Sequence, residues 1–221
     1  MKRVVVVLLS LVLLAGAAGI SRGQVVINEI MADPASDWNG DSTYSYRDDE
    51  WVEIFNAGPE TVDLTSYWLS DSDSTLLFNF CGALGPGRHK LVCGSEATEW
   101  QRANGKSAVG LRLNNDGDIV ILWVLAQDAA VPGSPEGAGR TQAEPSLVDS
   151  YNYQSHEAED DRSTGRLPDG GEGRALFDGL NPYTGGQVPQ GSGCPPTPGG
   201  SNGCPTPVKE LSWGSVKVLY R

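Results

Sequence analysis

The chain has 221 residues, of which 16 are lysine or arginine and 28 are aspartate or glutamate, so its formal net charge is −12. A surface this acidic repels the phosphate backbone, which argues against a nucleic-acid partner and favours solubility and divalent cations. The length allows one β-domain with a core of its own.

Residues 1–23 have the pattern of a secretory signal peptide. "MKR" is basic, "VVVVLLSLVLLAGAAGI" (Val4–Ile20) is apolar, and small residues stand at the end of this run. The run is shorter than the ~20 residues that span a bilayer, so we expect a leader that is cleaved between Ala17 and Gly23, with an uncleaved anchor as the alternative. Export of a mature domain over residues 24–204, without a membrane span, follows from this interpretation.

Runs in which apolar and polar residues alternate dominate the rest of the chain, as β-strands require. The first are Val25–Asp33 and Glu50–Asn56, followed by "DLTSYWLSD", "TLLFNF", "HKLVC", "GLRL", "DIVILWVL" and "LVDSYNY". Strict alternation places Glu29 on the same face as Ile27. "NNDGD" between "GLRL" and "DIVILW" is the clearest hairpin signal, and only Ser95–Lys106 has the cap and composition of a short helix. About eight or nine strands with so little helix predict an all-β sandwich or barrel.

Two segments are too rich in Gly and Pro for the interior of a sheet. We expect residues 126–146 to form a loop inserted between two strands. Residues 184–207 are expected to wrap the domain surface or to lead away from it.

The chain has four cysteines, an even number that suggests disulfides in an exported protein. Of the three pairings we favour the two local ones, Cys81–Cys93 around the apparent hairpin "GALGPGRHKLV" and Cys194–Cys204 around the turn-rich "PPTPGGSNG". Each would close a loop of about a dozen residues and stabilise the fold by about 3 kcal/mol. The spacing fits no Cys-x-x-Cys metal or redox motif.

Seven motifs in this order resemble the lamin-tail domain family, in particular its bacterial secreted members. They are "VVINEIMADP", "DDEWVEIFN", "DLTSYWLSD", "GLRLNNDGDIVILW", "DSYNY", "DRSTGRLPDG" and "TPGGSN", and they span Val25 to Asn202. The resemblance implies an immunoglobulin-like β-sandwich and a binding or structural role, because the family is not known for catalysis of its own. The insert at residues 126–146 and the cysteines around "TPGGSN" depart from the family pattern.

The last residues, 205–221, lie past the domain. They resemble the short C-terminal tails of exported bacterial proteins that serve as sorting signals. A loose end or an extra edge strand is the alternative.

The acidic loop before the second strand is the strongest candidate for a ligand site. Asp37, Asn39 and Asp41 place oxygen atoms at alternate positions, as at the start of a calcium loop, and Asp48 and Asp49 follow. Counted from Asp37, the sixth residue is Ser and the twelfth is Asp, so the loop is not an EF-hand. A looser cage of oxygens for calcium and a solvated loop of turn residues both remain open.

A catalytic interpretation has little support. Asp49, Glu50 and Glu53 are close enough in sequence to form a carboxylate pair, as a glycosidase needs, but side chains on opposite faces of a strand do not converge. Glu29 and Glu53 are better explained by hydrogen bonds to the backbone. Neither histidine lies in a motif spaced for zinc or for a nucleophile–base pair.

We therefore expect a secreted, non-enzymatic binding or structural module that works at the cell surface or outside the cell, with a protein or glycan as ligand and calcium as the one candidate cofactor. Trp38, Tyr44 and Tyr46 are candidates for stacking on sugar rings, with hydrophobic cover of the acidic loop as the alternative. The second hypothesis is a metal-dependent extracellular hydrolase, or an accessory domain of one, and it rests only on the acidic cluster.

Overall fold

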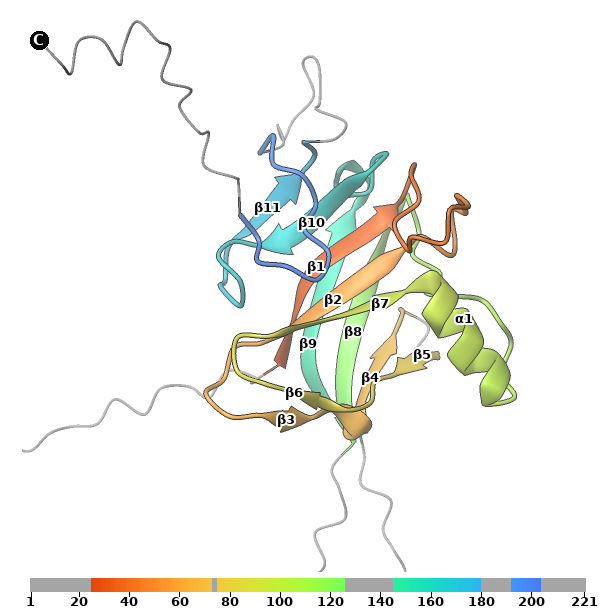
Figure 1. The fold of residues 1–221 in the computed structure, drawn as a ribbon, viewed down its shortest axis with the longest axis vertical. Coiled ribbons are helices and arrows are strands. Elements are labelled where there is room, and N and C mark those ends of the chain that lie inside the picture. Colours follow the sequence, from red (N-terminus) through yellow and green to blue (C-terminus); the bar gives the residue numbers. More distant parts are fainter. Residues whose placement is uncertain (1–24, 73–74, 126–144, 180–191, 204–221) are drawn as a thin grey trace, which may run out of the picture.

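The computed structural model describes residues 25–72, 75–125, 145–179 and 192–203. The expected signal peptide, most of the insert between the last two long strands and the C-terminal tail lie outside these residues, so those expectations stay predictions. The described residues form eleven strands in antiparallel sheets and one α-helix (Figure 1). None of the helices in this part of the chain is long and apolar enough to cross a membrane.

The larger sheet has five strands in the order β11–β10–β1–β2–β7. Their bounds are β1 (Val25–Asp33), β2 (Trp51–Asn56), β7 (His89–Cys93), β10 (Arg162–Arg166) and β11 (Arg174–Phe177). β1 and β2 lie near the middle of this sheet, and β10 adds to the other side of β1.

The second sheet has four strands in the order β5–β4–β8–β9 and lies behind the first in Figure 1. Its strands are β4 (Tyr67–Ser70), β5 (Leu76–Asn79), β8 (Gly117–Leu125) and β9 (Pro145–Gln154). The remaining elements are the short pair β3 (Val62–Asp63) and β6 (Ala83–Leu84), the helix α1 (Gly94–Ala103) and the 3₁₀ turns η1 (Leu64–Ser66) and η2 (Ser155–Glu157).

The hydrophobic core lies between the two sheets and confirms the expected all-β sandwich. Its fully buried members include Val25, Ile27, Ile30, Val52, Ile54, Leu69, Val120, Leu122 and Tyr153. In β2 every second residue, Val52 and Ile54, supplies a side chain to this core, which is the alternation that the sequence displays.

A β-bulge in β1 corrects the expected placement of Glu29. The register between β1 and β2 shifts between Ile27 and Glu29, so that Ile27 and Ile30 both face the core. Glu29 lies opposite Glu53 on the outer face, the face of the five-stranded sheet that points away from the core. A bulge inserts one extra residue, and a count of alternate positions cannot detect it.

The expected helix is confirmed and begins one residue early, at Gly94. The backbone N–H of Cys93 donates to Glu96 Oε2 at 3.0 Å, which caps the first turn. The expected "GLRL" strand is wrong, because Arg112 has a φ of 54° and cannot continue an extended strand. β8 therefore pairs with β4 and β9 rather than with this segment.

The expected Cys81–Cys93 disulfide is wrong, since Cys81 is free and exposed and Cys93 is free and buried. β6 pairs with β3 and β7 pairs with β2, so the supposed hairpin has its two arms in different sheets. Cys93 packs against Trp51, and burial raises the pKa of its thiol to about 12. Cys194 is disulfide-bonded. Its expected partner Cys204 lies outside the described residues, so this pairing stays a prediction.

Candidate functional site

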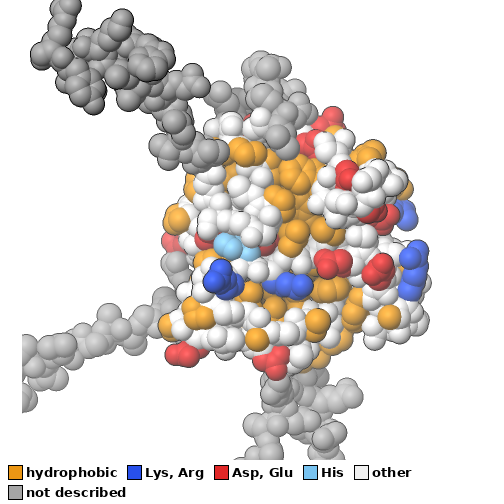
Figure 2. Space-filling model, viewed as in Figure 1, with side chains coloured by type: hydrophobic (Ala, Val, Ile, Leu, Met, Phe, Trp, Pro, Cys, Tyr) orange, Lys and Arg blue, Asp and Glu red, His pale blue; other side chains and the backbone are white. Residues whose placement is uncertain are grey.

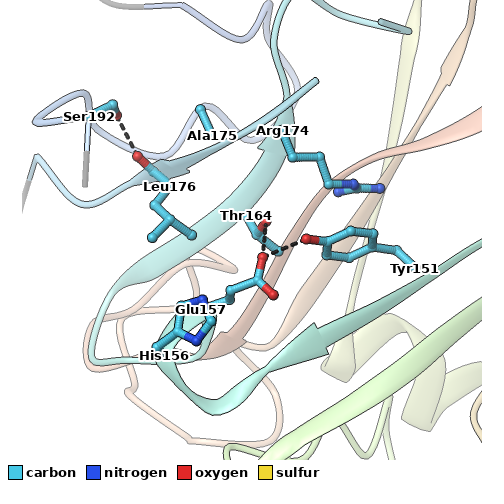
Figure 3. Close-up of a pocket in the computed structure, with 8 residues that line it drawn as sticks. All are labelled: Tyr151, His156, Glu157, Thr164, Arg174, Ala175, Leu176 and Ser192. Atoms are coloured by element: carbon cyan, nitrogen blue, oxygen red, sulfur yellow. Dashed lines mark hydrogen bonds between the residues drawn. The ribbon is translucent and has the colours of Figure 1, made fainter. Parts of the chain in front are cut away.

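A pocket of ≈ 320 Å³ lies between β9, η2, β10 and β11 (Figure 3). It is lined by Tyr151, His156, Glu157, Thr164, Arg174, Ala175, Leu176 and Ser192. Seven of these residues come from four elements that meet at one side of the sandwich, and Ser192 comes from the segment after residue 191.

Glu157 is the polar centre of the pocket. Its Oε1 accepts hydrogen bonds from the hydroxyls of Tyr151 at 2.5 Å and Thr164 at 2.9 Å, and its Oε2 accepts the backbone N–H of Gln154 at 2.8 Å. The last bond is half of a capping box, which fixes the side chain at the end of η2. Burial, and then the bond to Glu157, raise the pKa of the Tyr151 hydroxyl, so it remains a donor at neutral pH.

Arg174 supplies a fixed cation above the aromatic ring. Its guanidinium carbon lies 3.5 Å from the centroid of the Tyr151 ring, and its Nη2 donates to the carbonyl of Ile27 at 3.1 Å. Burial, and then the nearby Arg166, lower the pKa of Arg174 to about 10, which leaves it charged at neutral pH. The pocket thus combines a held carboxylate, a held cation and the apolar side chain of Leu176.

Sequence reasoning missed this pocket. It assigned His156 no role, although His156 lines the pocket beside Glu157. The capping box from Gln154 to Glu157 is a local signal that the sequence does carry. The approach of Arg174 to the ring of Tyr151 depends on the pairing of β11 with β10. No local sequence pattern reveals this pairing.

The predicted calcium ligands lie in one loop, but their carboxylates bind backbone amides of that loop. Asp37 accepts the N–H groups of Gly40 at 2.7 Å and Ser42 at 2.8 Å, and Asp41 accepts that of Thr43 at 2.7 Å. These are the side-chain turns that Asp favours in loops. Asn39 takes part in the same way, since its Oδ1 accepts the N–H of Asp41.

Asp49 is buried at the centre of the acidic loop. It accepts the backbone N–H groups of Trp38 at 2.8 Å, Asn39 at 2.9 Å and Ser45 at 2.7 Å, whereas Asp48 stays half-buried at the rim. Among the described residues, no three side chains of His, Cys, Asp or Glu are grouped to hold a metal ion. The internal hydrogen bonds order the loop, and calcium binding stays a prediction.

The carboxylates behind the hydrolase hypothesis lie in separate surroundings. Glu50 accepts the backbone N–H of Leu113 at 3.3 Å, while Glu53 accepts that of Gly199 at 2.7 Å on the outer face. Burial raises the pKa of both glutamates to about 8. Asp49 is bound inside the acidic loop, so each of the three carboxyl groups has backbone partners of its own.

The aromatic residues of the acidic loop divide into two kinds. Trp38 packs 6.1 Å from the ring of Trp51, and its Nε1 donates to Asp161 at 2.7 Å, so it covers the sheet. Tyr44 and Tyr46 are 53% and 61% exposed and remain available for contacts. Figure 2 shows hydrophobic side chains gathered at the surface on the face of the molecule drawn there.

The family model of the lamin tail domain matches residues 19–154, which is more than half of the chain. A search of curated proteins finds none that matches. The match ends at the last residue of β9, so β10, β11 and residues 192–203 lie beyond it. The antiparallel sandwich agrees with the immunoglobulin-like fold of this family. The chain belongs to the lamin tail domain family.

Proposed function

We propose that the chain is a non-enzymatic binding or structural module that is exported and works at the cell surface or outside the cell, in adhesion, as a scaffold or by binding a ligand. Membership of a non-catalytic, immunoglobulin-like family supports the binding or structural role. The signal-peptide pattern of the first 23 residues supports export, as does the resemblance of the motif order to bacterial secreted members of the family.

The pocket around Glu157 is the observation that carries a ligand-binding role. Its carboxylate, its guanidinium and the Tyr151 ring are held by protein contacts before any ligand arrives, and such preorganisation reduces the entropic cost of binding. Polar groups beside apolar walls suit a sugar or a peptide side chain. We therefore propose a protein or glycan ligand at this pocket.

Glycan and peptide arrays probed with residues 24–221 test this proposal. His156→Ala and Ser192→Ala alter the lining of the pocket without removing a donor to Glu157, and both should weaken binding to any hit. Arg102→Ala, on an exposed position of α1, is the control and should leave binding unchanged. Hits that bind all three variants like the parent chain would place the ligand elsewhere.

Calcium at the acidic loop is a separate part of the proposal. A carboxylate has about four acceptor positions, so Asp37 and Asp41 can bind a cation in addition to their backbone partners. Calcium that binds only the folded state raises the melting temperature by mass action, and Asp37→Ala/Asp41→Ala should abolish that rise. No shift at millimolar calcium would leave a loop ordered by its own hydrogen bonds.

The alternative function is a metal-dependent hydrolase or an accessory domain of one. The acidic cluster motivates it, although Asp49, Glu50 and Glu53 each accept different backbone N–H groups. If it is right, Glu53→Gln abolishes turnover of an extracellular polymer. If the binding role is right, the same change alters only stability.

A further inference from the structure

Residues 192–203, which we call the clasp, cross the outer face of the five-stranded sheet in front of β10 and β1 (Figure 1). The clasp begins beside β11, where the N–H of Ser192 donates to the carbonyl of Leu176 at 2.9 Å and the N–H of Gly179 donates to that of Cys194 at 2.8 Å. It lies beyond the family match, which ends at residue 154.

Three carboxylates of the domain receive the clasp. The bonds run from Thr197 N to Glu29 Oε1 at 3.1 Å, from Gly199 N to Glu53 Oε2 at 2.7 Å and from Asn202 N to Asp169 Oδ1 at 2.9 Å. Glu29 and Glu53 are fully buried and lie opposite each other on β1 and β2. Carboxylates this close repel one another when ionised, so a proton at one of them stabilises the closed clasp.

The hydroxyl of Thr197 identifies the carboxylate that carries the proton. Its oxygen lies 2.7 Å from Glu29 Oε2 and 2.8 Å from Asn202 Oδ1. The amide of Asn202 cannot turn, because its Nδ2 donates to the carbonyl of Arg166 at 2.8 Å. A hydroxyl has a single proton and donates to one acceptor only, so one of the two contacts lacks a hydrogen while Glu29 is ionised.

A proton on Glu29 Oε2 completes the set of bonds. Glu29 then donates to Thr197, the Thr197 hydroxyl donates to Asn202 Oδ1, and Asn202 donates to Arg166. Glu29 Oε1 still accepts the Ser163 hydroxyl and the N–H of Thr197. Protonation thus breaks none of these contacts.

Glu53 differs in this respect. Its two oxygens accept N–H groups from Asn28 Nδ2 at 2.9 Å and from Gly199 at 2.7 Å, and neither donor can accept a proton. A proton on Glu53 therefore finds no acceptor in either of these two partners, although the oxygen that carries it can still accept an N–H. Of the opposed pair, Glu29 is the one whose acid proton has an acceptor, the hydroxyl of Thr197.

We infer that Glu29 is a proton-binding site that locks the clasp onto the sheet, closed when Glu29 is a carboxylic acid and loosened when it ionises. The charged groups around it are Glu53 on β2 and Asp169 on the β10–β11 turn, both negative when ionised. His89 Nε2, 3.4 Å from Asp169 Oδ2, is a positive partner for Asp169 when protonated. The guanidinium of Arg166 is bound to Asp149 instead.

The direction of the effect follows from linkage. Burial raises the pKa of Glu29 above its ordinary value, and this effect outweighs the hydrogen bonds from Ser163 and Thr197, which lower the pKa. In the open state water reaches Glu29 and its pKa falls back. The closed state therefore binds the proton more tightly, so acid closes the clasp and alkali opens it.

Hydrogen exchange of the clasp in the full chain tests this inference, measured between about pH 5 and pH 9 and corrected for the intrinsic pH dependence of exchange. In the parent chain, protection of residues 192–203 should fall as the pH rises. Glu29→Gln should keep the clasp protected throughout, because the Gln Nε2 replaces the acid O–H as donor to Thr197. Protection of β1 and β2 in each variant verifies the fold, and all samples are kept oxidised because Cys194 is disulfide-bonded.

Two matched variants sharpen the test. Glu53→Gln replaces one of the two accepting oxygens with an amide nitrogen, whose N–H then faces the N–H of Asn28 or of Gly199. This variant should therefore lower clasp protection at every pH. Thr197→Val keeps the backbone donor but removes the hydroxyl, and should lower protection at acid pH about tenfold and flatten its pH dependence. The inference is wrong if the parent chain shows no pH dependence, if Glu29→Gln follows the parent curve, or if Thr197→Val behaves like the parent.

Discussion

The side chain of Gln101 uses all its hydrogen-bonding groups on backbone partners, although it is only 1% exposed. Its Nε2 donates to the carbonyls of Leu77 at 2.9 Å and Gly110 at 2.8 Å, and its Oε1 accepts the N–H groups of Val109 at 2.7 Å and Gly110 at 3.1 Å. It joins α1 to the loop that follows. This buried polar residue thus holds a loop in place.

Gln101→Ala should destabilise the domain by about 2–4 kcal/mol, because it leaves buried backbone groups without partners. Urea unfolding measures the change in the free energy of unfolding. The neighbouring Arg102→Ala is the control and should stay within about 0.5 kcal/mol of the parent, since Arg102 is exposed. Equal stability of the two variants would show that these four bonds contribute little.

The raised pKa of Glu50 predicts that the stability of the domain depends on pH. Burial raises its pKa from 4.5 to about 8, so between these values the folded state binds a proton that the unfolded state has lost. Its contribution to stability is fully present below 4.5 and is lost as the pH rises through about 8. Glu50→Gln, which cannot ionise, should flatten the curve of melting temperature against pH over this range. An unchanged slope would mean that Glu50 is already ionised in the folded state.

At the scale of elements, the sequence predicted the strands with regular alternation and the single helix, because each depends on residues near in the chain. The prediction failed where one backbone angle, or pairing with a strand distant in the chain, determined the structure. The positive φ of Arg112 ended an expected strand, the bulge in β1 turned Glu29 to the outer face, and β6 paired with β3. The acidic loop was located correctly, but not the backbone donors that bind its carboxylates.

Gly94 joins β7 to α1 at a point that excludes a side chain. A Cβ there would lie 1.7 Å from the carbonyl oxygen of Arg47, far inside contact distance. Gly94→Ala should therefore lower the melting temperature strongly, at a cost of roughly 3 kcal/mol or more. Gly85→Ala is the matched control, because its Cβ would meet Arg88 Cγ at 3.6 Å, an ordinary contact. Similar melting temperatures for the two variants would contradict the close approach.

At the scale of the whole molecule, the sandwich depends on residues beyond the family match. β10 pairs with β1 in the five-stranded sheet, β11 pairs with β10, and the clasp covers Glu29 and Glu53. The pocket around Glu157 also needs these elements, since Thr164 and Arg174 belong to β10 and β11. The motifs "DRSTGRLPDG" and "TPGGSN" indicated in the sequence that the domain continues this far.

A chain that ends at residue 154 should not fold cooperatively, because β1 would lose one of its two neighbouring strands and the buried carboxylates would lose their donors. Circular dichroism melts of residues 24–154 and 24–221 make the comparison. A cooperative transition of the shorter chain at the temperature of the longer one would show that β10, β11 and the clasp are dispensable.

Calorimetric titration of the strongest glycan or peptide hit into residues 24–221 and into the His156→Ala variant tests the proposed function most directly. We predict saturable binding to the parent chain, strongly weakened binding to His156→Ala, and recovery of the ligand intact after incubation. Equal binding by both chains would contradict the pocket as the ligand site. Chemical conversion of the ligand by the parent chain, lost in Glu53→Gln, would contradict the non-enzymatic role.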